Sequence, residues 1–77
     1  MNFYIQVIDQ NGVPKRLIGP GTYEQCEEKG KEVIAQELKI ESDRDPTQDE
    51  VDGWEMDGSF SFESGGGIYI VCSEDFS

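Results

Sequence analysis

Two short apolar stretches, one near each end of the chain, constrain the fold more than any other feature. In Asn2–Asp9 apolar side chains fill every second position, which is the period-2 pattern of a strand with one mostly buried face. Ile68–Ser73 is apolar on both faces, and this indicates a strand in the centre of a sheet. Val13–Ile18 and Ser59–Glu63 predict two further strands.

Glycine and proline residues mark the connections between these strands. Gln10–Gly12 predicts a tight turn, because Asn and Gly tolerate positive φ, so the chain opens with a hairpin. Pro14 confines the returning strand to an edge of the sheet, since proline donates no backbone hydrogen bond. Gly19–Gly21 is expected to end that strand, and Ser64–Gly67 to form the loop before the last one.

A long amphipathic helix is predicted from Tyr23 to about Lys39. Thr22 and Gln25 have the spacing of a capping box, which satisfies backbone N–H groups at a helix start. The apolar positions recur at three and four residues and form one stripe: Tyr23, Cys26, Gly30, Val33, Ile34 and Leu38. Glycine inside a helix costs about 1 kcal/mol relative to alanine, so we expect the helix backbone to approach the sheet closely at Gly30.

The segment from Glu41 to Asp57 is acidic and has few apolar residues. Asp45-Pro46 offers an N-cap followed by a proline suited to the first helical position, so we expect a short helix from Pro46 to about Asp52. Val51 and Trp54 are expected to face inward. The segment is therefore predicted to be helical or irregular.

Together these patterns predict one α+β domain over residues 1–77, with a short tail at 74–77. We expect a small antiparallel four-stranded sheet in the order β-β-α-(α)-β-β, with the long helix packed across one face. The chain has 77 residues, so we expect a thin core, because a domain of this size buries only about 60% of the surface that its unfolded chain exposes.

The sequence favours a cytoplasmic location. It has no apolar run long enough to span a bilayer and no basic region followed by a hydrophobic stretch at the N-terminus. Cys26 and Cys72 lie inside apolar periodic segments, so buried thiols are favoured over a disulfide.

Charge divides the chain unevenly. Residues 1–40 hold six acids and five bases, a net charge of −1, whereas residues 41–77 hold eleven acids and one base, a net charge of −10. Such a surface repels nucleic acid and anionic membranes and attracts basic surfaces. We therefore expect a basic partner and no direct binding to nucleic acid.

Enzymatic and cofactor chemistry is disfavoured. The chain has no histidine, the commonest general base near neutral pH and the commonest metal ligand. Gly65–Gly67 lacks the strand-to-helix context of a phosphate-binding loop. An EF-hand loop counted from Asp43 places Gln48 at the glycine position and Trp54 at the bidentate glutamate position. We predict no catalytic, cofactor or metal site, with a weak irregular cation site as the alternative.

The acidic segment is the candidate site, as a surface that contacts a partner protein. Nine acids face one base between Glu41 and Glu63, so few local ion pairs can form. The predicted partner-binding residues are Asp43, Asp45, Asp49, Glu50, Asp52, Glu55 and Asp57. Two other interpretations are a solvated face that maintains solubility and an adaptor subunit that binds through the edge strand Val13–Ile18 or an apolar patch.

In size, acidity, lack of histidine and expected α+β sheet, the chain resembles the small phage-encoded anti-CRISPR proteins. Several members of that group mimic nucleic acid in charge, and they share no sequence signature from which residue roles can be transferred. The resemblance implies an inhibitor that occupies the nucleic-acid channel of a CRISPR effector complex in the host cytoplasm.

Overall fold

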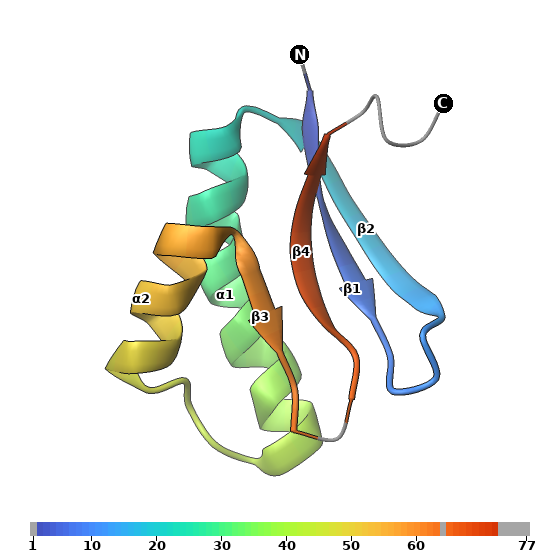
Figure 1. Cartoon of the computed structure of the whole chain (residues 1–77), viewed down its shortest axis with the longest axis vertical. Coiled ribbons are helices and arrows are strands. Elements are labelled where there is room, and N and C mark those ends of the chain that lie inside the picture. Colours follow the sequence, from blue (N-terminus) through green and yellow to red (C-terminus); the bar gives the residue numbers. More distant parts are fainter. Residues whose placement is uncertain (1, 64, 73–77) are drawn as a thin grey trace.

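The computed structural model describes residues 2–63 and 65–72 as two helices against a four-stranded antiparallel sheet (Figure 1). In chain order the elements are β1 (Phe3–Ile8), β2 (Pro14–Gly21), α1 (Tyr23–Ser42), α2 (Gln48–Asp57), β3 (Ser59–Ser61) and β4 (Gly67–Cys72). The strand order is β2-β1-β4-β3, and every neighbouring pair is antiparallel. The predicted α+β fold is confirmed. Predictions for Ser64, Ser73 and residues 74–77 fall outside the described part of the chain.

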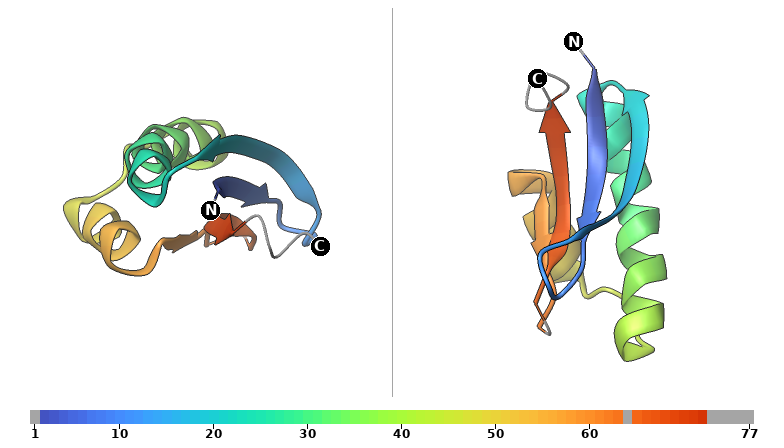
Figure 2. Two further views of the ribbon diagram at one scale, coloured as in Figure 1. Left: turned by 90° about the horizontal axis from the view of Figure 1, so that it is seen from above. Right: turned by 90° about the vertical axis from the view of Figure 1, so that its right-hand side faces the viewer.

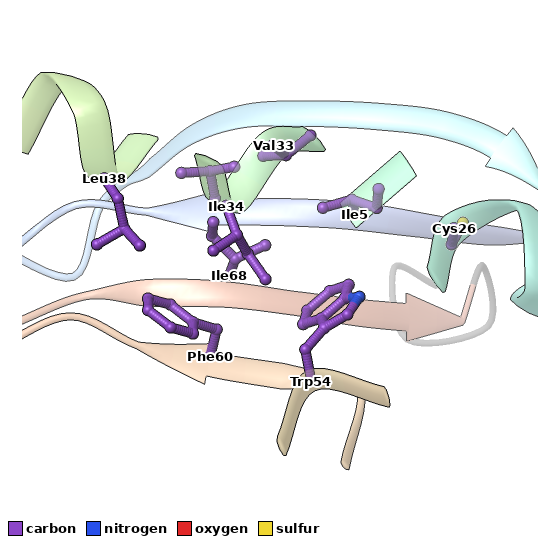
Figure 3. Packing of buried hydrophobic residues seen from close by; sticks show 9 residues of the cluster. Ile5, Cys26, Val33, Ile34, Leu38, Trp54, Phe60 and Ile68 are labelled. Atoms are coloured by element: carbon purple, nitrogen blue, oxygen red, sulfur yellow. The ribbon is translucent and has the colours of Figure 1, made fainter. Parts of the chain in front are cut away.

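Both helices lie on one face of the sheet and enclose the core with it (Figure 2). The core side chains come from α1, α2 and three of the strands, and they interdigitate between the two layers (Figure 3). They are Ile5, Val7, Cys26, Val33, Ile34, Leu38, Trp54, Phe60 and Ile68. No element in residues 2–63 or 65–72 covers the opposite face of the sheet, which faces the viewer on the right of Figure 2.

The register between β1 and β4 determines which side chains reach the core. Val7 lies opposite Ile68, and both are buried under the helices. Gln6 lies opposite Tyr69, and because side chains alternate along a strand, this pair points to the uncovered face. β4 pairs with both β1 and β3, which confirms its predicted central place.

β2 is an edge strand, as predicted, but it is longer than predicted. The expectation that Gly19–Gly21 ends it was wrong, since the strand continues to Gly21. A register shift opposite Phe3 and Ile5 accommodates the extra residue. Gly19 makes this possible: its φ is 140°, and a Cβ atom there would lie 2.9 Å from the carbonyl oxygen of Phe3.

α1 begins with the predicted capping box and ends later than predicted. The backbone N–H of Gln25 donates to Thr22 Oγ1 at 3.1 Å, and the Thr22 N–H donates to Gln25 Oε1 at 2.9 Å. The helix continues to Ser42, where Asp43 adopts a left-handed conformation and its N–H donates to the Lys39 carbonyl. Tyr23, expected on the buried stripe, is 39% exposed.

The close approach at Gly30 is confirmed, but its partner is α2 and not the sheet. A Cβ atom at Gly30 would lie 2.0 Å from Cζ2 of Trp54, so only glycine fits beneath the indole. Trp54 is 0% exposed, which confirms that it faces inward, and its Nε1 donates to the carbonyl oxygen of Glu27 at 2.9 Å. Glycine at this position therefore allows α1 and α2 to pack closely against each other.

Glu37 of α1 is buried, at 1% exposure, and two bases of β2 neutralise it. Lys15 Nζ lies 2.7 Å and Arg16 Nη1 lies 3.2 Å from its carboxylate oxygens. Adjacent strand residues normally point to opposite faces, but the register shift next to Val7 leaves Lys15 unpaired with β1, so both bases reach the same carboxylate. Burial alone raises the pKa of Glu37, and the hydrogen bonds from Lys15 and Arg16 outweigh it and hold the pKa below its ordinary value.

Two smaller predictions have outcomes in the described residues. Cys26 and Cys72 are thiols, and Cys26 is buried, which raises its pKa. β3 ends at Ser61, two residues earlier than predicted, because the N–H of Gly65 donates to the Phe62 carbonyl to form the turn.

Neither described helix is long and apolar enough to cross a bilayer.

Candidate protein-binding surface

The carboxylates are sorted by structural layer. None of the four strands carries an aspartate or glutamate. Residues 22–58, which form the two helices with their caps and connection and are called the helical layer below, hold thirteen acids and four bases, a net charge of −9. The two remaining acids of the described chain, Asp9 and Glu63, lie in the connections between strands. The helical layer therefore carries most of the negative charge of the molecule.

α2 begins and ends later than predicted. The expected cap at Asp45 and start at Pro46 were wrong, because Thr47 is the N-cap. The N–H of Glu50 donates to Thr47 Oγ1 at 3.2 Å, while the Glu50 carboxylate accepts from the Thr47 N–H at 2.9 Å. Gly58 ends the helix in a left-handed conformation, with its N–H bonded to the Trp54 carbonyl at 2.8 Å.

Glu50 is held within the fold. Both terminal nitrogens of the Arg44 guanidinium, Nη1 and Nη2, donate to its carboxylate, at 2.8 and 3.0 Å, in a bidentate pair. The Arg44 hydrogen bond, aided by the backbone N–H of Thr47, lowers the pKa of Glu50 to about 2. Of the predicted partner-binding residues, Glu50 is thus the one whose carboxylate fixes the start of α2.

All four bases of the helical layer contact acids of the same layer. Lys31 of α1 bridges Glu28 and Glu55, so it ties one predicted site residue of α2 to α1. These contacts raise the pKa of Lys31, the hydrogen bond with Glu55 most of all. The other pairs are Lys29–Glu32, Lys39–Asp43 and Arg44–Glu50. Every base of the helical layer is therefore paired with an acid of that layer, and the layer contains more acids than bases.

Four predicted site residues keep an uncompensated carboxylate: Asp45, Asp49, Asp52 and Asp57. All four are exposed, and no base in residues 2–63 or 65–72 lies within ion-pair distance of them. Asp49 and Asp52 lie one turn apart on the exposed side of α2, and Asp52 accepts a hydrogen bond from Gln48 Nε2 at 2.9 Å. We call these four residues the α2 acidic surface.

The helix dipole treats the carboxylates of this surface differently. Asp49 lies in the first turn of α2, where the positive end of the dipole stabilises an acid. Asp57 is the last residue of the helix, and the last turn contains no base. A carboxylate there lies at the negative end of the dipole, so the charge of Asp57 lowers the stability of the C-terminal end of α2.

The sequence-based prediction assigned the acidic surface to residues 43–57 and did not include the exposed acids of α1. Glu24, Glu28 and Glu32 are exposed in the same layer as α2, although the first forty residues have almost balanced charge. The balance is misleading because Lys15 and Arg16 belong to β2 and are paired with Glu37. The spacing of Glu24, Glu28 and Glu32, four residues apart on one helix, was the signal that could have identified them.

Comparisons with known proteins add no family assignment. No family model, no curated protein and no solved structure matches the chain. Within residues 2–63 and 65–72, no three histidine, cysteine, aspartate or glutamate side chains are grouped so that they could hold a metal ion.

Proposed function

We propose that this protein is a non-enzymatic inhibitor that presents the α2 acidic surface of its helical layer to a basic nucleic-acid-binding protein in the cytoplasm, in the manner of a nucleic-acid mimic. The observation that carries the proposal is the segregation of charge: thirteen acids against four bases in one layer, and none on the strands. A CRISPR effector complex is the proposed target, through the resemblance to anti-CRISPR proteins.

Such an inhibitor works by occupying a groove built for phosphates. A protein that holds DNA or RNA presents lysine and arginine to a dense array of negative charge. Carboxylates on a folded surface can pair with the same cations and block the groove without any chemical step. Their attraction weakens as salt rises, as it does for nucleic acid.

The packing of α2 supports this function because it fixes the carboxylates in place before binding. Trp54 and Gly30 join α2 to α1, and the Arg44–Glu50 pair fixes the start of the helix. A rigid surface loses less conformational entropy on binding than a flexible acidic tail.

A charge-matched pair of variants tests the proposal. The first, Asp45→Asn/Asp49→Asn/Asp52→Asn, removes three charges of the α2 acidic surface and leaves Glu50 intact. The control, Glu24→Gln/Glu32→Gln/Glu63→Gln, removes three exposed charges that lie outside the α2 acidic surface. We expect the wild type and the control to displace DNA from a susceptible purified CRISPR effector complex in a mobility-shift assay, and the first variant to be at least tenfold weaker.

Two results would contradict the proposal in different ways. If the wild type displaces DNA from none of a panel of CRISPR effector complexes, the proposed target is wrong. If both variants lose the same activity, net charge decides binding and the α2 acidic surface has no special part. Inhibition that is unchanged between about 0.05 and 0.5 M salt argues against an electrostatic decoy altogether.

The adaptor subunit remains the second candidate, but β2 has features that disfavour strand addition. It contains Pro14 and Pro20, two register shifts, and a lysine, all of which natural edge strands use to avoid pairing. β3, the other edge, is only three residues long. If the protein is an adaptor, the uncovered face of the sheet is the better place for its contact.

A further inference from the structure

α2 contains a glycine that the fold does not require. Gly53 lies in the middle of the helix, where glycine is less favourable than alanine, and it lacks the positive φ that only glycine adopts easily. A Cβ atom there would meet no described heavy atom within 4 Å, apart from its chain neighbours and the backbone of its own helix. Gly30 is the opposite case, since a Cβ atom there would collide with Trp54. Packing therefore explains Gly30 and leaves Gly53 unexplained.

Gly53 lies on the outward face of α2, beside carboxylates of the α2 acidic surface. Four residues have the i, i+3, i+4, i+7 spacing that places side chains on one side of a helix: Asp49, Asp52, Gly53 and Met56. Trp54, which is 0% exposed, lies on the opposite side. Met56 is 83% exposed, more than any other large hydrophobic residue of the described chain. This face therefore combines two carboxylates, a position without a side chain, and one apolar side chain.

We propose that this face receives the side chain of a lysine or arginine of the target, an inference that rests on the proposed function and specifies its contact. Lysine and arginine bury their methylene stems along apolar surface while their charged groups stay among polar partners. On this face the stem lies over Gly53 and against the thioether of Met56, and the charged group reaches Asp49 or Asp52. A side chain at position 53 would occupy the place of the stem.

Charge complementarity selects this occupant over other ligands. Asp49 and Asp52 are exposed, and no base in the described part of the chain lies within ion-pair distance of either. The net charge of −9 on the helical layer repels a phosphate group or an acidic peptide. A wholly apolar side chain would contact Met56 but would remove water from the carboxylates without pairing them. Only a long basic side chain satisfies both parts of the face, and the flexible thioether of methionine can adapt to its stem.

Two substitutions that keep every charge test the contact. Gly53→Gln fills the place of the stem and should weaken displacement of DNA from a susceptible effector complex about tenfold, while Met56→Gln, which removes the apolar contact, should weaken it about threefold. The control Ile40→Gln changes an apolar side chain that is 73% exposed on α1, outside this face. It should alter displacement less than about twofold.

Gly53→Ala separates binding from stability. This variant should raise the midpoint of urea unfolding, because alanine favours a helix, and should still weaken displacement of DNA, because its methyl group lies where the stem passes. Met56→Gln should weaken displacement by the same factor at about 0.05 and 0.2 M NaCl, because it removes no charge. Asp49→Asn/Asp52→Asn should instead make displacement less dependent on salt.

The outcomes distinguish this inference from the proposed function. If the wild type displaces DNA from no effector complex, both are wrong. If the wild type displaces DNA and Gly53→Gln and Met56→Gln displace it equally well, only the lysine or arginine contact is overturned. Circular dichroism checks that each variant is folded. Should Gly53→Gln unfold, Gly53→Ala decides, and a more stable Gly53→Ala with unchanged displacement overturns the inference.

Discussion

The helical layer and the uncovered face of the sheet differ in charge in a way that the two halves of the sequence do not. By sequence, residues 1–40 are nearly neutral and residues 41–77 are acidic. By structure, each half contributes one helix to the acidic layer and strands to a sheet that has no acid. Charge in this protein follows the layers of the fold, so the charge of a surface cannot be inferred from the charge of a sequence segment.

The two surfaces also depend on different interactions. The sheet is held by backbone pairing between β1 and its two neighbours. The helical layer depends on a few side-chain contacts: the indole of Trp54 over Gly30, the bases around Glu37, and the Arg44–Glu50 pair. Each of these contacts can be disrupted by a single substitution.

The largest effect is expected where the two helices meet. Gly30→Ala should destabilise the protein by about 2 kcal/mol in urea unfolding, because the new methyl group collides with the Trp54 indole. In a Trp54→Leu background, which is itself destabilised by about 2–4 kcal/mol, the collision is gone. There the same change should be neutral or stabilise by up to about 1 kcal/mol, because alanine favours the helix.

The effect of Gly30→Ala on stability should therefore depend on whether residue 54 is tryptophan. A double-mutant cycle measures it directly, since residues in contact give a coupling energy and independent residues do not. If Gly30→Ala costs the same in both backgrounds, the glycine is required for a reason other than the indole of Trp54.

The second largest effect is expected at Glu37, which joins α1 to the edge strand β2. Glu37→Gln should cost about 1–2 kcal/mol, because glutamine keeps an acceptor for Lys15 and Arg16 but removes the charge they neutralise. The control Glu32→Gln, an exposed acid on the same helix, should change stability by less than about 0.5 kcal/mol. Equal effects of the two variants would mean that burial of Glu37 has no energetic consequence.

The fold was largely predictable from the sequence because it depends on local patterns. Alternation indicated the strands at Asn2–Asp9 and Ser59–Glu63, the Gln10–Gly12 turn indicated the returning strand, and the apolar run Ile68–Ser73 indicated the last one. The Thr22–Gln25 spacing located the start of α1. The start of α2 was missed because Asp45-Pro46 and Thr47 both offer a cap. What decided between them was Arg44, which binds Glu50, a residue that can complete a capping box only with Thr47.

The candidate site was less predictable, because pairing between distant residues is not visible in a linear pattern. Glu50 and Glu55 look equivalent to Asp49 and Asp52 in the sequence, but the fold gives the first two a basic partner. In the same way, no local pattern in the sequence pairs Glu37 with a base, and only the register shift in β2 brings two bases to it.

Acid should weaken the start of α2 in a way that depends on Glu50. The folded-state pKa of Glu50 is about 2, below its ordinary value of 4.5, so its contribution to stability is complete above about pH 4.5 and is lost as the pH falls toward 2. Urea unfolding of the wild type and Glu50→Gln should differ by about 1–2 kcal/mol at pH 7, and the difference should shrink steadily between pH 4.5 and 2. A difference that is independent of pH would mean that the carboxylate charge is not what Arg44 and Thr47 hold.

The smallest effect is expected at the two ends of α2, where the helix dipole acts on carboxylates in opposite directions. Asp57→Asn should stabilise the protein by about 0.3–0.5 kcal/mol at low salt, because it removes an acid from the C-terminal end of α2. Asp49→Asn, at the other end of the same helix, should destabilise it by a similar amount, and salt should reduce both effects. Urea unfolding at about 0.02 and 0.5 M NaCl measures these differences. If the two variants change the free energy of unfolding in the same direction, the helix dipole does not explain either effect.

The value of Asp57 lies in this conflict between stability and surface charge. If Asp57→Asn is more stable and also displaces less DNA from the susceptible effector complex, the carboxylate is kept for the partner and not for the fold. If it is more stable and inhibits equally well, Asp57 contributes only to net charge, and the contact lies with Asp45, Asp49 and Asp52 in the first half of the α2 acidic surface.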